Sequence, residues 1–186
     1  MNKLTAMDII FNPPDNDENQ YIRLMVGELN EKGYRIHALA NFFSSYKHFK
    51  SIRLVHLNWF ENVDDRNFFI AVKSFFRKMV VLVAIRISGK PLVWTMHNRT
   101  SHERGLAFFS RALVHFLQRW SHSIVVHSHQ SEAILSAVGN NVVRKMVYLP
   151  HPNFIRVYGA ITPKISRKSP SLHLLFMGMI KPYKNI

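Results

Sequence analysis

The sequence contains no cysteine, which excludes disulfide bonds, thiolate nucleophiles and cysteine-ligated zinc sites. A chain without cysteine suits a reducing compartment, and we expect a cytoplasmic protein. Acidic residues are also scarce, because 11 Asp and Glu stand against 25 Lys and Arg, for a formal net charge of +14. Such an excess favours acidic partners, namely phosphorylated ligands, anionic lipids or nucleic acids.

No long uninterrupted hydrophobic run is present. The longest candidate is residues 68–87, and it contains four basic residues: Lys73, Arg77, Lys78 and Arg86. A membrane-spanning helix needs about 20 apolar residues with few charges, so we expect no such helix here. Near the start, Asp8 and the polar residues 14–17 cut the apolar stretch short, and no signal peptide is expected. Hydrophobic residues still make up 47% of the 186, enough for one good-sized core.

Three motifs of common enzymes are also missing. The first loop reads Asn-Pro-Pro-Asp at residues 12–15, without the G-x-G-x-x-G pattern that holds a dinucleotide pyrophosphate. There is no Walker A motif and no serine-centred nucleophile elbow. His127 and His129 lie two residues apart, but no third ligand is near them in the sequence. We therefore expect neither a metal nor a cofactor.

Strand-like and helix-like patterns alternate along the chain. Short apolar runs predict strands at residues 7–11, 34–38, 53–57, 91–96, 123–126 and 146–149. Apolar stripes and end signals predict helices at residues 19–32, 67–88 and 106–120, a short helix within 42–50, and a helix capped by Ser128. This alternation indicates an α/β fold, a Rossmann-like parallel sheet with helices on both faces.

The composition changes after Pro152. Residues 162–171 are rich in Ser, Pro and basic residues, as in a solvated linker, and residues 173–177 resemble a new strand. We expect a first domain at residues 1–160, a linker at 161–171 and, at 172–186, the truncated start of a second domain.

Polar side chains follow the predicted strands where each strand ends. The clearest case is residues 90–103, in which an apolar strand gives way abruptly to a polar loop that begins at His97. The carboxyl ends of parallel strands meet at one edge of the sheet, where open α/β sheets bind ligands. A structural role remains the alternative for His97, and for His56 a bond to the backbone is the simpler interpretation. The candidate cleft-lining residues, besides His97, are Asn12, Asp15, His56, Asn58, Asn98, His102, His127, Ser128, His151 and Asn153.

Two further basic features allow two interpretations each. Lys181 and Lys184 follow the last predicted strand and can hold a diphosphate as point charges, or they are simply solvated. Residues 68–87 combine cations with four phenylalanines, which would suit an anionic membrane surface. The four phenylalanines are Phe68, Phe69, Phe75 and Phe76, and we expect most of them to belong to the core.

Four segments, taken in order, resemble one enzyme family. They are Val55-His-Leu-Asn-Trp-Phe-Glu61, Val93-Trp-Thr-Met-His-Asn98, Tyr148-Leu-Pro-His-Pro-Asn-Phe154 and Phe176-Met-Gly-Met-Ile-Lys-Pro-Tyr-Lys-Asn185. Together they are similar to retaining nucleotide-sugar glycosyltransferases of the GT-B fold, in particular the group 1 or family 4-like enzymes of bacterial polysaccharide assembly.

The resemblance implies a two-domain enzyme whose first Rossmann-like domain binds the acceptor and whose second binds a sugar nucleotide. His97 would face the transferred sugar, and Lys181 and Lys184 would contact the donor diphosphate, with no metal needed. The acceptor would be lipid-linked or a polysaccharide, at the inner face of the cell membrane. The first loop departs from the family because it lacks glycines, and the family's paired glutamates are absent. The chain is therefore expected to be inactive alone.

A binding module without catalysis is the alternative: a basic α/β domain that holds nucleic acid or a membrane. Nucleic acid is not the expected partner, because no RNP-like, KH-like or helix-turn-helix pattern is visible.

Overall fold

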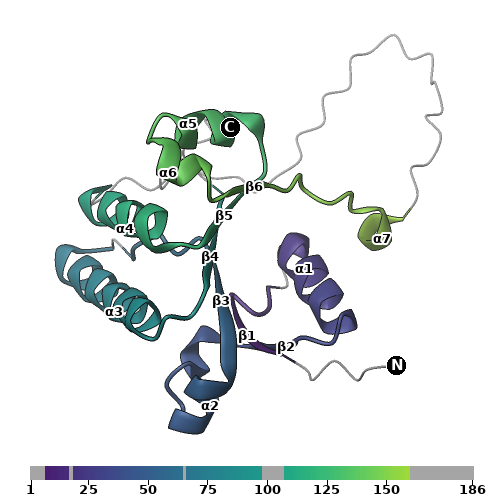
Figure 1. The fold of residues 1–186 in the computed structure, drawn as a ribbon, viewed down its shortest axis with the longest axis horizontal. Coiled ribbons are helices and arrows are strands. Elements are labelled where there is room, and N and C mark those ends of the chain that lie inside the picture. Colours follow the sequence, from purple (N-terminus) through teal and green to yellow (C-terminus); the bar gives the residue numbers. More distant parts are fainter. Residues whose placement is uncertain (1–6, 17–18, 65, 98–106, 160–186) are drawn as a thin grey trace. The chain divides into compact units, whose positions relative to one another are not determined.

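The computed structural model describes residues 7–16, 19–64, 66–97 and 107–159 (Figure 1). The chain divides into a first unit that ends at Pro152 and a second that begins at Asn153, and each is treated by itself. Several predictions lie outside the described residues: Asn98, His102, the linker at 161–171, the strand at 173–177, Lys181 and Lys184.

The first unit is built on a six-stranded, wholly parallel sheet. The strands are β1 (Asp8–Asn12), β2 (Arg35–His37), β3 (Ile52–Asn58), β4 (Leu92–Met96), β5 (Ser123–Val126) and β6 (Met146–Tyr148). Their order across the sheet is β2-β1-β3-β4-β5-β6. The predicted Rossmann-like α/β class is confirmed, and each strand predicted before Pro152 is present with its ends moved by at most one residue.

Helices cover both faces of this sheet. In Figure 1, α1 lies on one side of the strands and α3 and α4 lie on the other. The helical segments of the first unit are α1 (Gln20–Glu31), the 3-10 turn η1 (Leu39–Asn41), α2 (Tyr46–Ser51), α3 (Phe68–Ile87), α4 (Ala107–Trp120), α5 (His129–Ser136) and α6 (Asn140–Val143). The second unit contains α7 (Ile155–Tyr158). Among the helices that the structure describes, none combines the length and the apolar character needed to cross a membrane.

Local sequence signals set the helix ends. Ser128 accepts a hydrogen bond from the backbone N–H of Ser131 and so caps α5, as predicted, and Asn67 caps α3 in the same way through Ile70. Gly33 and Gly89 follow α1 and α3 with φ of 85° and 67°, the left-handed conformation that glycine adopts without strain.

The prediction of one short helix within residues 42–50 is only partly right. Phe42 is fully buried and ends the η1 turn, and α2 begins at Tyr46, after Ser45, whose hydroxyl caps it. The four-residue helices α6 and α7 were not predicted, because one helical turn is too short to show an apolar period.

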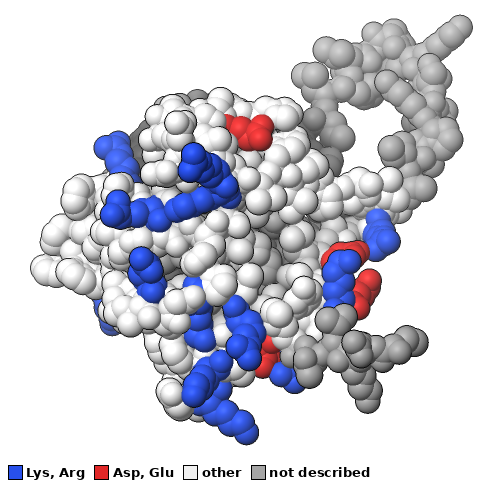
Figure 2. Space-filling model, viewed as in Figure 1, with Lys and Arg blue, Asp and Glu red and all other residues white. Residues whose placement is uncertain are grey.

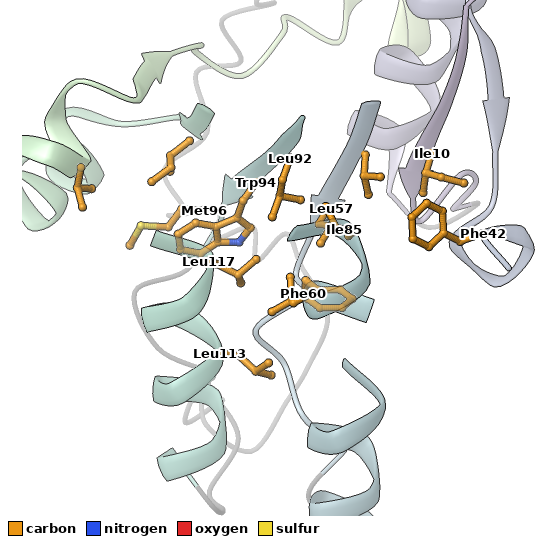
Figure 3. Packing of buried hydrophobic residues seen from close by; sticks show 14 of the residues in the cluster. Ile10, Phe42, Leu57, Phe60, Ile85, Leu92, Trp94, Met96, Leu113 and Leu117 are labelled. Carbon is orange, nitrogen blue, oxygen red and sulfur yellow. The ribbon is translucent and has the colours of Figure 1, made fainter. Parts of the chain in front are cut away.

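The core lies between the sheet and the pair α3 and α4 (Figure 3). Trp94 on β4 is fully buried among Leu113 and Leu117 of α4 and Ile85 of α3, which belong to the same cluster. Burying each such aliphatic side chain contributes about 1.5–3 kcal/mol. Because β4 is buried along nearly its whole length, its carboxyl end has a fixed position, and His97 follows it directly.

Candidate functional site

The carboxyl ends of the strands form the candidate site. The connection from β1 leads to β2 on one side, whereas β3 pairs on the other side of β1. In open parallel sheets this change of direction leaves a crevice beyond the strand ends. Asn12 ends β1, Asn58 ends β3, and His97 follows β4 at the same edge.

A hydrogen-bonded chain connects these three residues. The Asn58 side-chain nitrogen donates to the backbone oxygen of Asn12 at 3.2 Å, and the Asn58 side-chain oxygen lies 3.0 Å from Nε2 of His97. A carbonyl oxygen only accepts, so the first contact fixes the orientation of the Asn58 amide. Nε2 of His97 must then carry the proton, and in the neutral ring Nδ1 keeps its lone pair.

Trp59 holds the other side of the His97 ring. The two rings stack with centroids 3.9 Å apart and planes 14° apart. Trp59 has a φ of 48°, in the left-handed region that bulky residues rarely adopt. Such conformations persist where surrounding contacts enforce them and are concentrated at functional sites. Here the conformation places an indole against the imidazole.

His127 follows β5 and adds a second acceptor. Its Nδ1 lies 2.6 Å from the backbone oxygen of Leu149, so Nδ1 carries the proton. Its Nε2 is buried and has no hydrogen-bond partner in the described part of the chain. A buried nitrogen with an unused lone pair is costly unless a ligand or water satisfies it.

The ring of Tyr21, in the first turn of α1, packs edge-on against three histidine rings. The ring centroids lie 5.3 Å from His97, 5.0 Å from His127 and 5.4 Å from His151. The rings of His127 and His151 are 4.1 Å apart. Four aromatic side chains from distant parts of the first unit therefore form one group, which we call the histidine cluster: Tyr21, His97, His127 and His151.

The hydroxyl of Tyr21 is buried without a well-formed hydrogen bond. Burial raises the pKa of Tyr21, and a weaker interaction with the Thr95 side chain partly opposes this shift. The phenol therefore remains protonated at neutral pH and is available as a donor.

Burial keeps two imidazoles neutral. It lowers the pKa of His97 to about 3, and the neighbouring histidines add to this shift. It also lowers the pKa of His56 to about 4, with a smaller effect from His127. Neutral imidazoles accept hydrogen bonds and carry no charge. With the free lone pairs of His97 and His127, the cluster suits a neutral ligand that carries hydroxyl groups.

The other predicted site residues have different placements. His56 is buried and pairs with a side chain, the Thr95 hydroxyl at 2.7 Å, where we expected a backbone partner. Ser128 caps α5. Asp15 is exposed. Asn153 belongs to the second unit and is not placed relative to the cluster.

Sequence reasoning missed Tyr21, Trp59 and Thr95. The only local signal for Tyr21 is Asn19, whose side chain accepts from the Tyr21 N–H and so places the tyrosine in the first turn after the β1 loop. Thr95 lies within an apolar strand and gave no signal.

Within residues 7–16, 19–64, 66–97 and 107–159, no group of three or more His, Asp or Glu side chains is arranged to hold a metal ion. No family model, curated protein or solved structure matches this chain.

The neutral histidines predict a loss of stability in mild acid. As pH falls below 6.5, histidines of the unfolded chain take up protons, whereas folded His97 and His56 stay neutral down to about 3 and 4. The unfolded state then binds more protons, so the free energy of unfolding should fall by up to about 1.4 kcal/mol per pH unit for each histidine. Urea unfolding at several pH values measures this slope.

Replacing one histidine shows how much of this pH dependence of stability that residue causes. We expect His56→Leu to reduce the slope between pH 6.5 and 4, because the variant lacks one of the histidines that stay neutral in the folded state. Asp8 acts separately: its contacts with Arg35 and His37 hold its pKa well below the usual 3.8, so its contribution is lost only at lower pH. An unchanged slope in His56→Leu would contradict the assignment.

Proposed function

We propose that this chain forms the acceptor-side half of a GT-B-type glycosyltransferase. The complete enzyme would transfer a sugar from a nucleotide-diphosphate sugar to a lipid-linked or polysaccharide acceptor. The observation that carries the proposal is His97: a neutral imidazole at the carboxyl edge of the sheet, held by Asn58 and stacked on Trp59. The ordered resemblance of four segments to this family supports it, and the Rossmann-like fold agrees with it.

In this proposal His97 touches the transferred sugar. Nε2 is engaged with Asn58, so Nδ1 is the atom that would accept a hydrogen bond from a sugar hydroxyl. The buried Nε2 of His127 and the hydroxyl of Tyr21 would make polar contacts to hydroxyl groups nearby. A neutral site suits these contacts, because a charged imidazolium would be a donor only.

The rest of the machinery follows from the resemblance. Lys181 and Lys184 would hold the donor diphosphate and stabilise the negative charge that develops as the glycosidic bond breaks. The donor pocket and a pair of glutamates would come from a second domain, and the 186-residue chain would not catalyse transfer alone.

A donor screen tests the enzyme assignment. The complete protein is incubated with a panel of sugar nucleotides and candidate acceptors, and release of the free nucleoside diphosphate is measured. Acceptor-dependent release with at least one donor is the expected result. No release with any donor, while the protein stays folded, would contradict the proposal and favour a binding module without catalysis.

The surface of α3 supports a peripheral location at a membrane. The expectation that most phenylalanines of this helix belong to the core is wrong, because Phe68, Phe69 and Phe76 are exposed and only Phe75 packs against the core. The exposed stripe also includes Val80, 62% exposed, and Ile87, 81% exposed.

Cations lie next to this stripe. Lys73 and Arg77 are exposed on the same helix, four residues apart. Exposed apolar side chains flanked by cations suit an anionic lipid surface, because the apolar groups enter the acyl boundary while the cations contact headgroups. We propose that α3 contacts the membrane in this way.

Vesicle sedimentation tests the contact. The protein should bind vesicles that contain phosphatidylglycerol at low salt and less at high salt, because salt screens the cations. Phe69→Ser combined with Phe76→Ser should lower binding at least about tenfold. Tyr158→Ser, which removes an exposed aromatic ring from α7, is the matched control and should bind normally. Equal loss in both variants would rule out a specific role for α3.

A further inference from the structure

A cavity lies at the edge of the sheet opposite to the histidine cluster. Its volume is about 840 Å³, and it is lined by the last turns of α3 and α4 and by the segment that leads from α5 through α6 to β6. Ser121 and His122 directly precede β5, and Lys145 directly precedes β6. Because all strands run parallel, this is their amino-terminal edge, away from the histidine cluster.

The cavity is strongly basic. Arg86, Arg119, Arg144 and Lys145 line it, and among the residues that the structure describes no Asp or Glu does. The three arginines of the cavity take part in no ion pair within the described part of the chain. The ion pairs found there have Asp8, Asp64 or Glu132 as the acidic partner. Figure 2 shows Lys and Arg side chains gathered on the same side of the molecule as α3, α4 and α6, with few acidic ones among them. Unpaired arginines around one hollow favour an anion with several oxygen atoms.

Two neutral groups at the cavity add hydrogen-bonding capacity. Ser121 is only 2% exposed, and its hydroxyl has no hydrogen-bond partner among the described residues. Nδ1 of His122 accepts from the backbone N–H of Leu92 at 3.1 Å, so in the neutral ring Nε2 carries the proton and can donate. An unpaired buried hydroxyl is costly, and a bound ligand oxygen would satisfy it.

Lys145 removes an obstacle to anion binding at this place. The carboxyl end of a helix carries partial negative charge, which repels anions. Nζ of Lys145 donates to the last carbonyl groups of α4, to Gln118 at 3.3 Å and Arg119 at 2.9 Å. The lysine thus neutralises the helix end, and the arginines remain available for a ligand.

We propose that this cavity binds a small anion that carries two or more phosphoryl groups. Its volume lies within the range of small-molecule sites, about 300–1,000 Å³. Three arginines can each form paired hydrogen bonds to phosphoryl oxygens, which one phosphoryl group alone does not satisfy. Single-stranded nucleic acid instead calls for an extended basic groove with a series of stacking aromatics. The proposal does not depend on sugar transfer at the other edge.

Calorimetric titration with pyrophosphate tests the site. We expect saturable binding to the 186-residue chain, weakened at least about tenfold by Arg119→Ala combined with Arg144→Ala. Arg23→Ala combined with Arg111→Ala makes the same change in net charge at exposed arginines outside the cavity, and should bind nearly normally. Absence of binding, or equal weakening in both pairs, would overturn the proposal.

Ser121→Ala separates binding from folding. It should weaken pyrophosphate binding several-fold without lowering Tm, because the hydroxyl has no partner in the described part of the protein to lose. Normal pyrophosphate affinity in Ser121→Ala would remove the serine from the site and overturn the proposed pocket.

The source of the phosphoryl groups is tested with vesicles that contain phosphatidylinositol bisphosphate. If soluble pyrophosphate competes with the vesicles and the Arg119 and Arg144 variant no longer binds them, the ligand is a lipid headgroup. If neither soluble pyrophosphate nor the double substitution changes vesicle binding, and the variant still loses pyrophosphate binding, the ligand is a soluble anion. Both results support the cavity as the phosphate site.

Discussion

Replacing His97 by alanine in the complete protein should lower sugar transfer at least about a hundredfold, the usual effect of losing a preorganised polar contact to the reacting group. The imidazole is held on one side by Asn58 and on the other by Trp59, so its Nδ1 has a fixed position. Alanine offers no group at that position. Transfer is measured as release of nucleoside diphosphate with the donor found in the screen.

Two further variants show whether the loss is chemical or structural. His129→Ala removes an exposed histidine from the start of α5, after the neighbouring strand β5, and should retain normal transfer. His97→Gln retains a side-chain donor for Asn58 but not the imidazole, so it should fold normally and remain inactive. If His97→Ala transfers sugar at the wild-type rate, the proposed role of His97 is wrong.

Replacing Trp94 by alanine should cost about 3–5 kcal/mol of unfolding free energy, the range for truncating a large buried aromatic residue. Trp94 is fully buried within the core cluster. Its indole nitrogen also donates to Oε2 of Glu61 at 3.1 Å, and the other oxygen of this carboxyl has no partner in the described part of the chain. Urea unfolding of the variant measures the loss.

A double-mutant cycle separates packing from the hydrogen bond. Burial raises the pKa of Glu61, although the indole and the nearby charge of Lys78 oppose the shift. Trp94→Phe retains most of the packing but removes the indole N–H that donates to Glu61, and should cost about 1–3 kcal/mol. The same substitution should cost less in a Glu61→Leu background, where no carboxyl is left unpaired. An equal cost in both backgrounds would show that the hydrogen bond contributes nothing.

The two proposed sites lie at opposite edges of one sheet and differ in charge. At the carboxyl edge, burial keeps His97 of the histidine cluster neutral, whereas the cavity at the amino edge is lined by four cations. The net charge of +14 alone does not make this distinction. The net charge predicted an acidic partner, and such a partner suits the basic cavity and the cations of α3 better than it suits the histidine cluster.

Local signals predicted the elements well where they were strong. Residues 123–126 were predicted as a strand with the bounds that the structure has, and the strand that Pro91 was expected to open begins one residue later, at Leu92, because each is a compact apolar run. Ser128 was recognised as a cap from its position alone. The phenylalanines of α3 were misassigned, because this helix is apolar around most of its circumference and its sequence does not reveal which side meets the sheet.

The sequence alone determined the alternation of strand and helix, because periodicity and end signals act over a few residues. The alternation in turn predicted a parallel sheet whose polar strand ends share one edge. Only the tertiary structure decided which groups meet there. Tyr21 joins three histidines that lie 76 to 130 positions further along the chain, and Ser121 is left without a partner inside a basic cavity. Such contacts depend on the order in which strands pair and on the packing of whole helices, and no short stretch of sequence encodes either.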